Sequence, residues 1–64
     1  MNYKFIMQYE GKTVNLTLAN KFWYKGKIIS VSEEAVIFIS EDGRNITIEP
    51  SLILLIFPIG ANGK

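Results

Sequence analysis

The segment from Leu52 to Phe57 constrains the fold most, because all six of its residues are apolar. It is far shorter than the ~20 residues that a membrane-spanning helix needs. A strand covered on one face should alternate between apolar and polar residues, but this one is apolar on both faces. One face can fill the core of the domain, and the other then needs a partner.

A ring of identical subunits would supply that partner. An exposed apolar edge strand tends to pair with other chains, and pairing it with a neighbouring subunit removes that hazard. When such a head-to-tail contact is repeated, it closes a ring. We therefore predict a cyclic homo-oligomer. The alternative is a fully buried central strand in a monomer, although a 64-residue barrel has little room for one.

The length of the chain also favours oligomerisation. A single domain of 64 residues buries only about 60% of the surface that its unfolded chain exposes. The sequence contains no Cys and no His, so neither disulfides nor thiolate metal ligands add stability. Association between subunits is the remaining source of buried surface. We predict one domain over residues 1–58 and a flexible tail over residues 59–64.

Alternation of apolar and polar residues with a period of two predicts β-strands over most of the chain. One apolar row begins after Thr13 and continues, with the same parity, through a predicted tight turn at residues 20–21. The apolar members of this row are Val14, Leu16, Leu18, Phe22, Tyr24 and Ile28. We therefore expect Phe22 and Tyr24 to point into the core.

Three more segments complete the predicted sheet, namely residues 35–40, 44–49 and 51–57. Asp42-Gly43 marks a hairpin between the third and fourth strands, because this pair favours the left-handed backbone of two-residue turns. Pro50 must end the fourth strand, since it cannot donate a ladder hydrogen bond.

We predict an all-β domain, built as a small, five-stranded, strongly bent antiparallel barrel of the SH3 type. The chain is too short for two packed sheets, so one sheet that closes on itself is the economical solution. Gly26 lies inside a strand, where a residue without a Cβ lets the sheet bend or bulge. Residues 2–9 form either an extra strand or a short helix, because their pattern suits both.

Charge is divided unevenly along the chain. Residues 11–32 contain four Lys and no acids, for a charge of +4, whereas residues 33–49 contain five acids and one Arg, for −4. Such asymmetry predicts one face that suits an anionic partner and another that repels it. Ordinary solvated charge on strand surfaces is the alternative explanation.

Trp23 has the opposite parity to its aromatic neighbours and is therefore expected on the surface. It shares its predicted face with Lys21, Lys25 and Lys27. An indole beside lysines suits base stacking with neutralisation of the adjoining phosphates. Alternatively, the indole seals a subunit interface or packs under the N-terminal segment as apolar area.

Residues 14–28, VNLTLANKFWYKGKI, resemble the first motif of the Sm/LSm family. That motif has alternating apolar residues, a turn, and a Gly two residues before an aliphatic, here Gly26 and Ile28. Residues 53–58, ILLIFP, resemble the end of the second motif, where aliphatics precede a Pro. Within the family, the pattern is most similar to that of bacterial Hfq. The resemblance spans roughly residues 11–58.

The resemblance implies a five-stranded Sm-like sheet, a pentameric to heptameric ring built by pairing the fourth and fifth strands of neighbours, and binding of single-stranded RNA. The predicted interface residues are Ile46, Ile48, Leu52, Leu54, Leu55 and Ile56. The Hfq face that prefers adenine-rich RNA corresponds here to Thr17 and residues 21–25. The predicted nucleic-acid-binding residues are Thr17, Lys21, Trp23, Lys25 and Lys27.

The residues with which the family binds uridine are missing. The Asp and Asn of the first Sm motif correspond to Ser32 and Val36, and the Arg-Gly of the second falls near residues 49–50. The Gln-Phe and Lys-His pairs of Hfq correspond to Glu-Glu at residues 33–34 and Pro-Ser at residues 50–51. Because carboxylates repel phosphate, we expect no RNA binding of the usual kind on that face.

The leading hypothesis is a non-catalytic ring that binds single-stranded RNA, or another single-stranded nucleic acid, through the Trp23 face. The alternative is a protein-interaction or assembly ring that keeps the scaffold without binding RNA. An enzyme is least favoured, because no His, no activated nucleophile and no Gly-rich phosphate loop is present.

We also expect no metal, cofactor or small-molecule substrate, because the carboxylate pairs in the turns have no third ligand in register. The N-terminus lacks the pattern of a signal peptide, so a soluble, cytoplasmic protein that does not bind membranes is expected.

Overall fold

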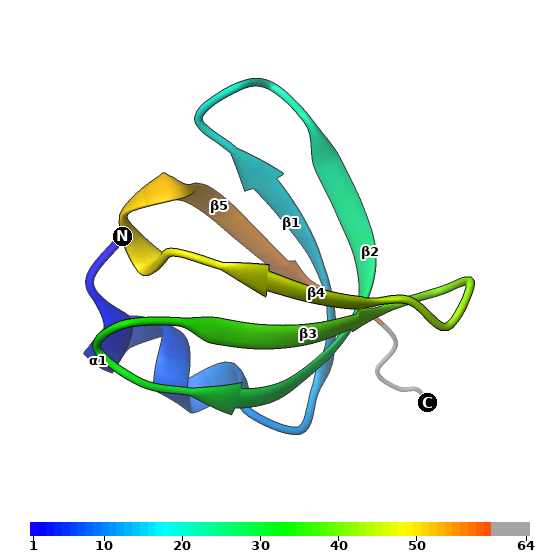
Figure 1. Cartoon of the computed structure of the whole chain (residues 1–64), viewed down its shortest axis with the longest axis horizontal. Helices are drawn as coiled ribbons and strands as arrows, with labels where there is room; N and C mark the ends of the chain where they lie inside the picture. The colour runs from blue at the N-terminus through cyan, green and yellow to red at the C-terminus, as the bar shows by residue number, and fades with distance from the viewer. Residues whose placement is uncertain (60–64) are drawn as a thin grey trace.

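The computed structural model describes residues 1–59 and contains one antiparallel sheet of five strands. The strands are β1 (Thr13–Leu18), β2 (Trp23–Val31), β3 (Val36–Ser40), β4 (Asn45–Ile48) and β5 (Ile53–Pro58). Their order across the sheet is β4-β3-β2-β1-β5, and the sheet curls into a small barrel-like shape (Figure 1). The predicted all-β fold with five antiparallel strands is therefore confirmed.

The N-terminal segment is helical rather than an extra strand. The helix α1 (Tyr3–Ile6) runs directly into the 3₁₀ turn η1 (Met7–Tyr9). The side chain of Asn2 caps α1 by accepting a hydrogen bond from the Lys4 backbone N–H at 2.8 Å. Tyr3, Ile6 and Tyr9 recur every third residue on the side that faces the protein, and Ile6 is fully buried. This helical spacing was hidden by the alternation of Tyr3, Phe5, Met7 and Tyr9 in the sequence.

Both predicted tight turns are present, and each contains a residue with a left-handed backbone. Lys21 has a φ of 73° in the β1–β2 turn, and Gly43 has a φ of 90° in the β3–β4 turn. The Asn20 side chain supports the first turn by accepting a hydrogen bond from the Phe22 N–H at 3.1 Å. The two hairpins project from the body of the domain in different directions (Figure 1).

The sheet bends where the backbones of the paired strands β2 and β3 approach each other most closely, at Gly26. Gly26 is paired with Ser40, and a Cβ on Gly26 would lie 2.1 Å from the backbone oxygen of Ile39. No other residue type has room at this close approach of the two backbones. Three residues further on, Ile29 is an extra residue in β2, because the pairing passes from Ile28 directly to Ser30. Such a β-bulge bends the strand and increases its twist.

The inner face of the curled sheet holds the hydrophobic core. Its nine buried residues are Ile6, Val14, Leu16, Leu18, Ile28, Val36, Phe38, Ile48 and Ile53. Tyr24 is half-buried and packs against this core, as its parity predicted.

The prediction that Phe22 lies in the core is wrong. Its side chain is 61% exposed, and β2 begins only at the following residue. Phe22 belongs to the turn, where its carbonyl accepts a hydrogen bond from the Leu18 N–H at 2.8 Å. The tip of the β1–β2 hairpin extends beyond the other strands (Figure 1), and Phe22 borders a small hollow there with Lys21, Trp23 and Tyr24.

The two edges of the sheet are β4 and β5. Pro50 ends the fourth strand as predicted, but Pro50–Leu52 then form a 3₁₀ turn, η2, so that β5 begins only at Ile53. Leu54 is an extra residue in β5, because Thr17 pairs with Leu55 and Leu18 pairs with Ile53. As a result, β5 exposes apolar side chains along most of its length, namely Leu54, Leu55 and Phe57.

One hydrogen bond follows the end of β5. The N–H of Ile59 donates it to the Thr13 carbonyl at 3.0 Å, which ties the first residue of the predicted tail to β1. The rest of the predicted tail, residues 60–64, lies outside the described residues. Within residues 1–59, no helix is long and apolar enough to cross a membrane.

The close approach of β2 and β3 at Gly26 leads to a test of the fold. We expect Gly26→Ala to lower the free energy of unfolding by about 1–3 kcal/mol or more, because the new methyl group must displace backbone rather than a side chain. Chemical denaturation would measure the change. The control is Ser30→Ala in the same strand, an exposed position where the effect should stay within about 0.5 kcal/mol. Equal stabilities for the two variants would contradict the close approach of the two backbones at Gly26.

Candidate nucleic-acid interface

The outer face of β1 and β2 brings together four of the five residues predicted to bind nucleic acid. Trp23 is 67% exposed and lies directly opposite Thr17 on β1. Lys25 and Lys27 follow on the same face of β2, and both are exposed. The expectation that Trp23 lies on the surface is confirmed. We call the outer surface around Thr17, Trp23, Lys25 and Lys27 the Trp23 face.

The fifth predicted residue, Lys21, lies in the turn rather than on the strand. It borders a small hollow at the tip of the hairpin together with Phe22, Trp23 and Tyr24. Two cations therefore flank the indole, Lys21 on the side of the turn and Lys25 along the strand.

The neighbouring strand β5 extends the Trp23 face with apolar side chains. Leu55 pairs with Thr17, which pairs in turn with Trp23, so these three residues form one row across the sheet. In the next row, Phe57 on β5 is followed by Asn15 and Lys25. Phe57 is 54% exposed. The aromatic surface of this face is therefore larger than the sequence indicated.

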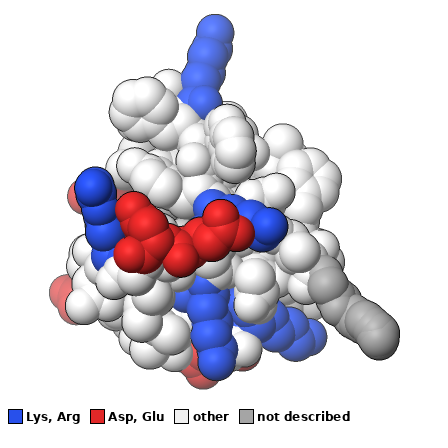
Figure 2. Space-filling view, turned by 90° about the vertical axis from the view of Figure 1, so that its right-hand side faces the viewer, with Lys and Arg blue, Asp and Glu red and all other residues white. Residues whose placement is uncertain are grey.

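The β3–β4 hairpin places acidic side chains beside the lysines. Glu41 Oε2 lies 3.2 Å from Lys25 Nζ, and the Glu41 N–H donates a backbone hydrogen bond to the Lys25 carbonyl at 2.8 Å. Asp42 and Arg44 form a second ion pair, with Oδ2 and Nε 3.3 Å apart. Viewed from the side on which this hairpin projects, acidic side chains lie between basic ones (Figure 2). The charges that are separated along the sequence are thus partly interleaved in space.

Asp42 is held in its charged form. The hydrogen bond from the Ser40 hydroxyl is the main cause that lowers the pKa of Asp42 below its ordinary value of 3.8, and contacts with Arg44 act in the same direction. A lowered pKa means that the carboxylate keeps its charge until the solution is more acidic than that value. The hairpin tip is therefore an ion-paired, charged structure throughout the neutral range.

Asn15, in the middle of the Trp23 face, carries an unsatisfied polar atom. Its Oδ1 is buried and has no hydrogen-bond partner within residues 1–59. A buried acceptor without a donor costs about 1–3 kcal/mol. Asn15 is thus a weak point of an otherwise regular strand pair.

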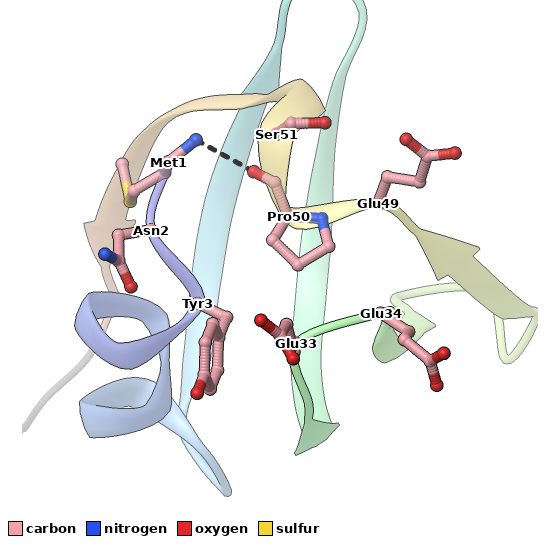
Figure 3. A pocket seen from close by; sticks show the side chains of 8 residues that line it. All are labelled: Met1, Asn2, Tyr3, Glu33, Glu34, Glu49, Pro50 and Ser51. Atoms are coloured by element: carbon pink, nitrogen blue, oxygen red, sulfur yellow. Dashed lines mark hydrogen bonds between the residues drawn. The ribbon is translucent and has the colours of Figure 1, made fainter.

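A second pocket, of about 370 Å³, lies where α1 meets η2. It is lined by Met1, Asn2, Tyr3, Glu33, Glu34, Glu49, Pro50 and Ser51. Glu33 lies beside Tyr3, while Glu34 and Glu49 point away from it (Figure 3). The α-amino group of Met1 donates hydrogen bonds to the Pro50 and Ile53 carbonyls at 2.9 and 3.0 Å.

This acidic pocket joins residues that are far apart in the sequence. Residues 33–34 and 50–51, which the Sm/LSm resemblance matches to the two uridine-binding pairs of Hfq, line the same pocket. Its lining contains three carboxylates and no Lys or Arg side chain. The α-amino group of Met1 is a single positive charge against these three carboxylates, so the lining is net negative, which disfavours phosphate.

The six predicted interface residues are distributed over β4, η2 and β5. Leu52, Leu54 and Leu55 are exposed, while Ile46 and Ile56 are half-buried. Ile48 is only 4% exposed and belongs to the core, so that it can reach a neighbour only through its backbone.

The described part of the chain offers little to a metal. Within residues 1–59, no group of three or more Asp, Glu, His or Cys side chains is placed to hold an ion. No protein-family model matches the chain, and none of the curated proteins is significantly similar to it.

The sequence did not indicate that the hairpin residues Glu41 and Arg44 border the Trp23 face. If the strands paired regularly from Val31–Val36 onwards, Gly26 would pair with Glu41. The extra residue Ile29 shifts the register by one, so that Gly26 pairs with Ser40 instead. The Gly26 signal indicated a bend, but not the resulting one-residue shift.

Asn15 provides a test of this surface. We expect Asn15→Val to raise the free energy of unfolding by about 1 kcal/mol, because it removes the unsatisfied oxygen and introduces a residue that favours strands. Thermal or chemical denaturation would measure the gain. Thr13→Val, at an exposed position of the same strand, controls for strand propensity alone. A loss of stability in Asn15→Val would mean that the amide oxygen has a hydrogen-bond donor in solution.

Proposed function

We propose that this protein is a non-catalytic, ring-forming, Sm-like protein that binds single-stranded RNA, or another single-stranded nucleic acid, on the Trp23 face. One observation carries the binding part of the proposal. A largely exposed indole lies on a regular strand, with Lys21 and Lys25 on either side of it. Exposed aromatics beside cations are how sequence-tolerant proteins stack bases and neutralise phosphates.

A bound ligand would explain in energetic terms why Trp23 is exposed. Leaving so large an apolar side chain in water forgoes the burial that a small domain needs. Stacking of one base on an aromatic side chain contributes about 1–3 kcal/mol, and a ring would repeat the contact in every subunit.

The edges of the sheet support the ring. The Sm/LSm resemblance implies that the fourth strand of one subunit pairs with the fifth strand of the next, and here β4 and β5 are the two edge strands. The exposed leucines at positions 52, 54 and 55 give such a contact apolar area to bury. The acidic pocket supports the choice of the Trp23 face over the family's uridine-binding face.

A second candidate function is a protein-interaction or assembly ring without RNA binding. The observation that favours it is the Lys25–Glu41 ion pair, which takes one cation of the Trp23 face away from phosphate. The exposed Leu55 and Phe57 on the same face would suit a protein partner as well as a base.

Replacement of Trp23 tests the nucleic-acid proposal. We expect Trp23→Ala to weaken binding of fluorescein-labelled oligo-A, oligo-U or single-stranded DNA by about five- to 150-fold, the loss of one stacked base. Fluorescence anisotropy at several salt concentrations would measure the affinity, which should fall as salt rises because the lysines release counterions on binding. Phe5→Ala removes an exposed aromatic from α1 and should leave the affinity unchanged.

If wild-type protein at micromolar concentration binds none of these probes, the nucleic-acid proposal is wrong. If the wild type does bind them, the doubly substituted Trp23→Ala, Lys25→Ala protein separates the two functions. A variant that has lost RNA but still captures the protein partners of the wild type would favour the assembly ring.

Substitution in β5 tests the ring. We expect wild-type protein to have a native mass of five to seven chains, as the Sm/LSm resemblance implies, and Leu54→Lys to shift it towards the monomer, because a charge cannot be buried in an apolar contact without a partner. Light scattering after size-exclusion chromatography would measure both masses. Ile29→Lys, at an exposed apolar position of β2, is the matched control. A monomeric wild type would remove the ring from the proposal.

A further inference from the structure

A cleft of about 480 Å³ adjoins the Trp23 face, between the start of β2 and the β3–β4 hairpin. Trp23 and Tyr24 line one side. The hairpin supplies the polar lining, which consists of Ser40, Glu41, Asp42, Arg44 and Asn45. A volume of this size falls in the range of small-ligand sites and can admit a nucleobase with its sugar.

The pairing of the strands explains why the cleft is open. The pairs between β2 and β3 begin at Gly26–Ser40, so Trp23 and Tyr24 extend beyond the last β3 partner. On the other side, Trp23 remains paired to Thr17 of β1 and is held in place. The backbone of Trp23 is thus fixed at one side of the cleft, and the hairpin forms the opposite side.

The charges that line the cleft cancel. Lys25 pairs with Glu41 at 3.2 Å, and Arg44 pairs with Asp42 at 3.3 Å. A cleft with no net charge gives little attraction to a phosphate chain, in contrast to Lys21 at the hairpin tip, which forms no ion pair within residues 1–59. What it offers beside the aromatic wall is a set of hydrogen-bonding groups, and these recognise base edges rather than backbone.

The lining holds both donors and acceptors, and the acceptor that the cleft offers to a base edge is Glu41. Asp42 uses one oxygen for Ser40 and the other for Arg44. The ion pair of Glu41 uses Oε2 and leaves Oε1 without a partner within residues 1–59, on a side chain that is 70% exposed. Each carboxylate oxygen can accept two hydrogen bonds, so Glu41 can keep Lys25 and still take a second pair of donors.

Among the bases, guanine presents the edge that matches a carboxylate. Its ring N1–H and exocyclic amino group point in the same direction and can donate two parallel hydrogen bonds, as the guanidinium of Arg does. Adenine and uracil offer no such pair of adjacent donors. Cytosine has only its amino group as a donor on that edge.

We propose that this cleft is a base-reading subsite that selects guanine in single-stranded RNA, with Trp23 stacking on the base and Glu41 accepting hydrogen bonds from its N1–H and amino groups. The proposal rests on the nucleic-acid function proposed above and adds the base preference to it. Lys25 is a positioning residue, because its ion pair holds the Glu41 side chain at the cleft.

The test compares five-nucleotide RNAs that differ only in the central base. Fluorescein-labelled UUGUU, UUIUU, UUAUU and UUCUU would be titrated with the wild-type protein and followed by anisotropy, where I is inosine. We expect UUGUU to bind at least about fivefold more tightly than UUAUU, the lower end of what one bidentate contact contributes. UUIUU should lie between the two, because inosine keeps N1–H and lacks the amino group.

Glu41→Gln identifies the reading group. The amide places a donor where the carboxylate accepted, so the ratio of the UUAUU to the UUGUU dissociation constant should fall towards one. The affinity for UUGUU should fall because its paired contact is lost, whereas the affinity for UUAUU should stay equal or rise, because the substitution removes a negative charge and frees Lys25. Glu33→Gln makes the same chemical change in the acidic pocket and should leave the ratio unchanged.

The outcomes distinguish failure of the guanine subsite from failure of RNA binding as a whole. Equal binding of all four RNAs, tighter binding of UUCUU than of UUGUU, or an unchanged ratio in Glu41→Gln would overturn the guanine subsite while leaving RNA binding intact. Failure of the wild type to bind any of the four would overturn both.

Discussion

The close approach of the β2 and β3 backbones at Gly26 determines where the other surfaces of this protein lie. With the Ile39 oxygen in the space that a Cβ would occupy, the two strands approach at a point that only Gly allows. The bulge at Ile29 adds to the bend and shifts the register by one residue. The β1–β2 and β3–β4 hairpins project in different directions (Figure 1), and the cleft lies between the start of β2 and the β3–β4 hairpin.

Much of the fold could be predicted from the sequence, because the information is local. Alternation identified the strands, Asp42-Gly43 and residues 20–21 identified the turns, and Pro50 identified the end of β4. The position of Phe22 could not be predicted in this way. Parity carries across a turn only if something lies opposite the far side, and the tip of the β1–β2 hairpin extends beyond the other strands (Figure 1). Residues 2–9 remained ambiguous, since spacings of two and of three both fit them.

The candidate site was predictable only on one strand. The exposure of Trp23 and its neighbours Lys25 and Lys27 followed from parity alone. The contribution of the β3–β4 hairpin required the pairing register, which the bulge changes without leaving a mark in composition. For the same reason, charges that look segregated along the chain meet in space through the Lys25–Glu41 pair. Net charge by segment is therefore a poor guide to surface potential in so small a sheet.

The bulge at Leu54 shortens the regular part of the edge strand β5, and such a strand is what stacks into fibres. An apolar edge strand of six or seven regular residues is about the length that stacks into cross-β aggregates. In β5 the extra residue interrupts the straight ladder, which leaves Leu55–Pro58 as the regular part. A bulge also twists the edge away from a flat template. The extra residue thus leaves four regular residues in β5, while Leu54, Leu55 and Phe57 stay exposed.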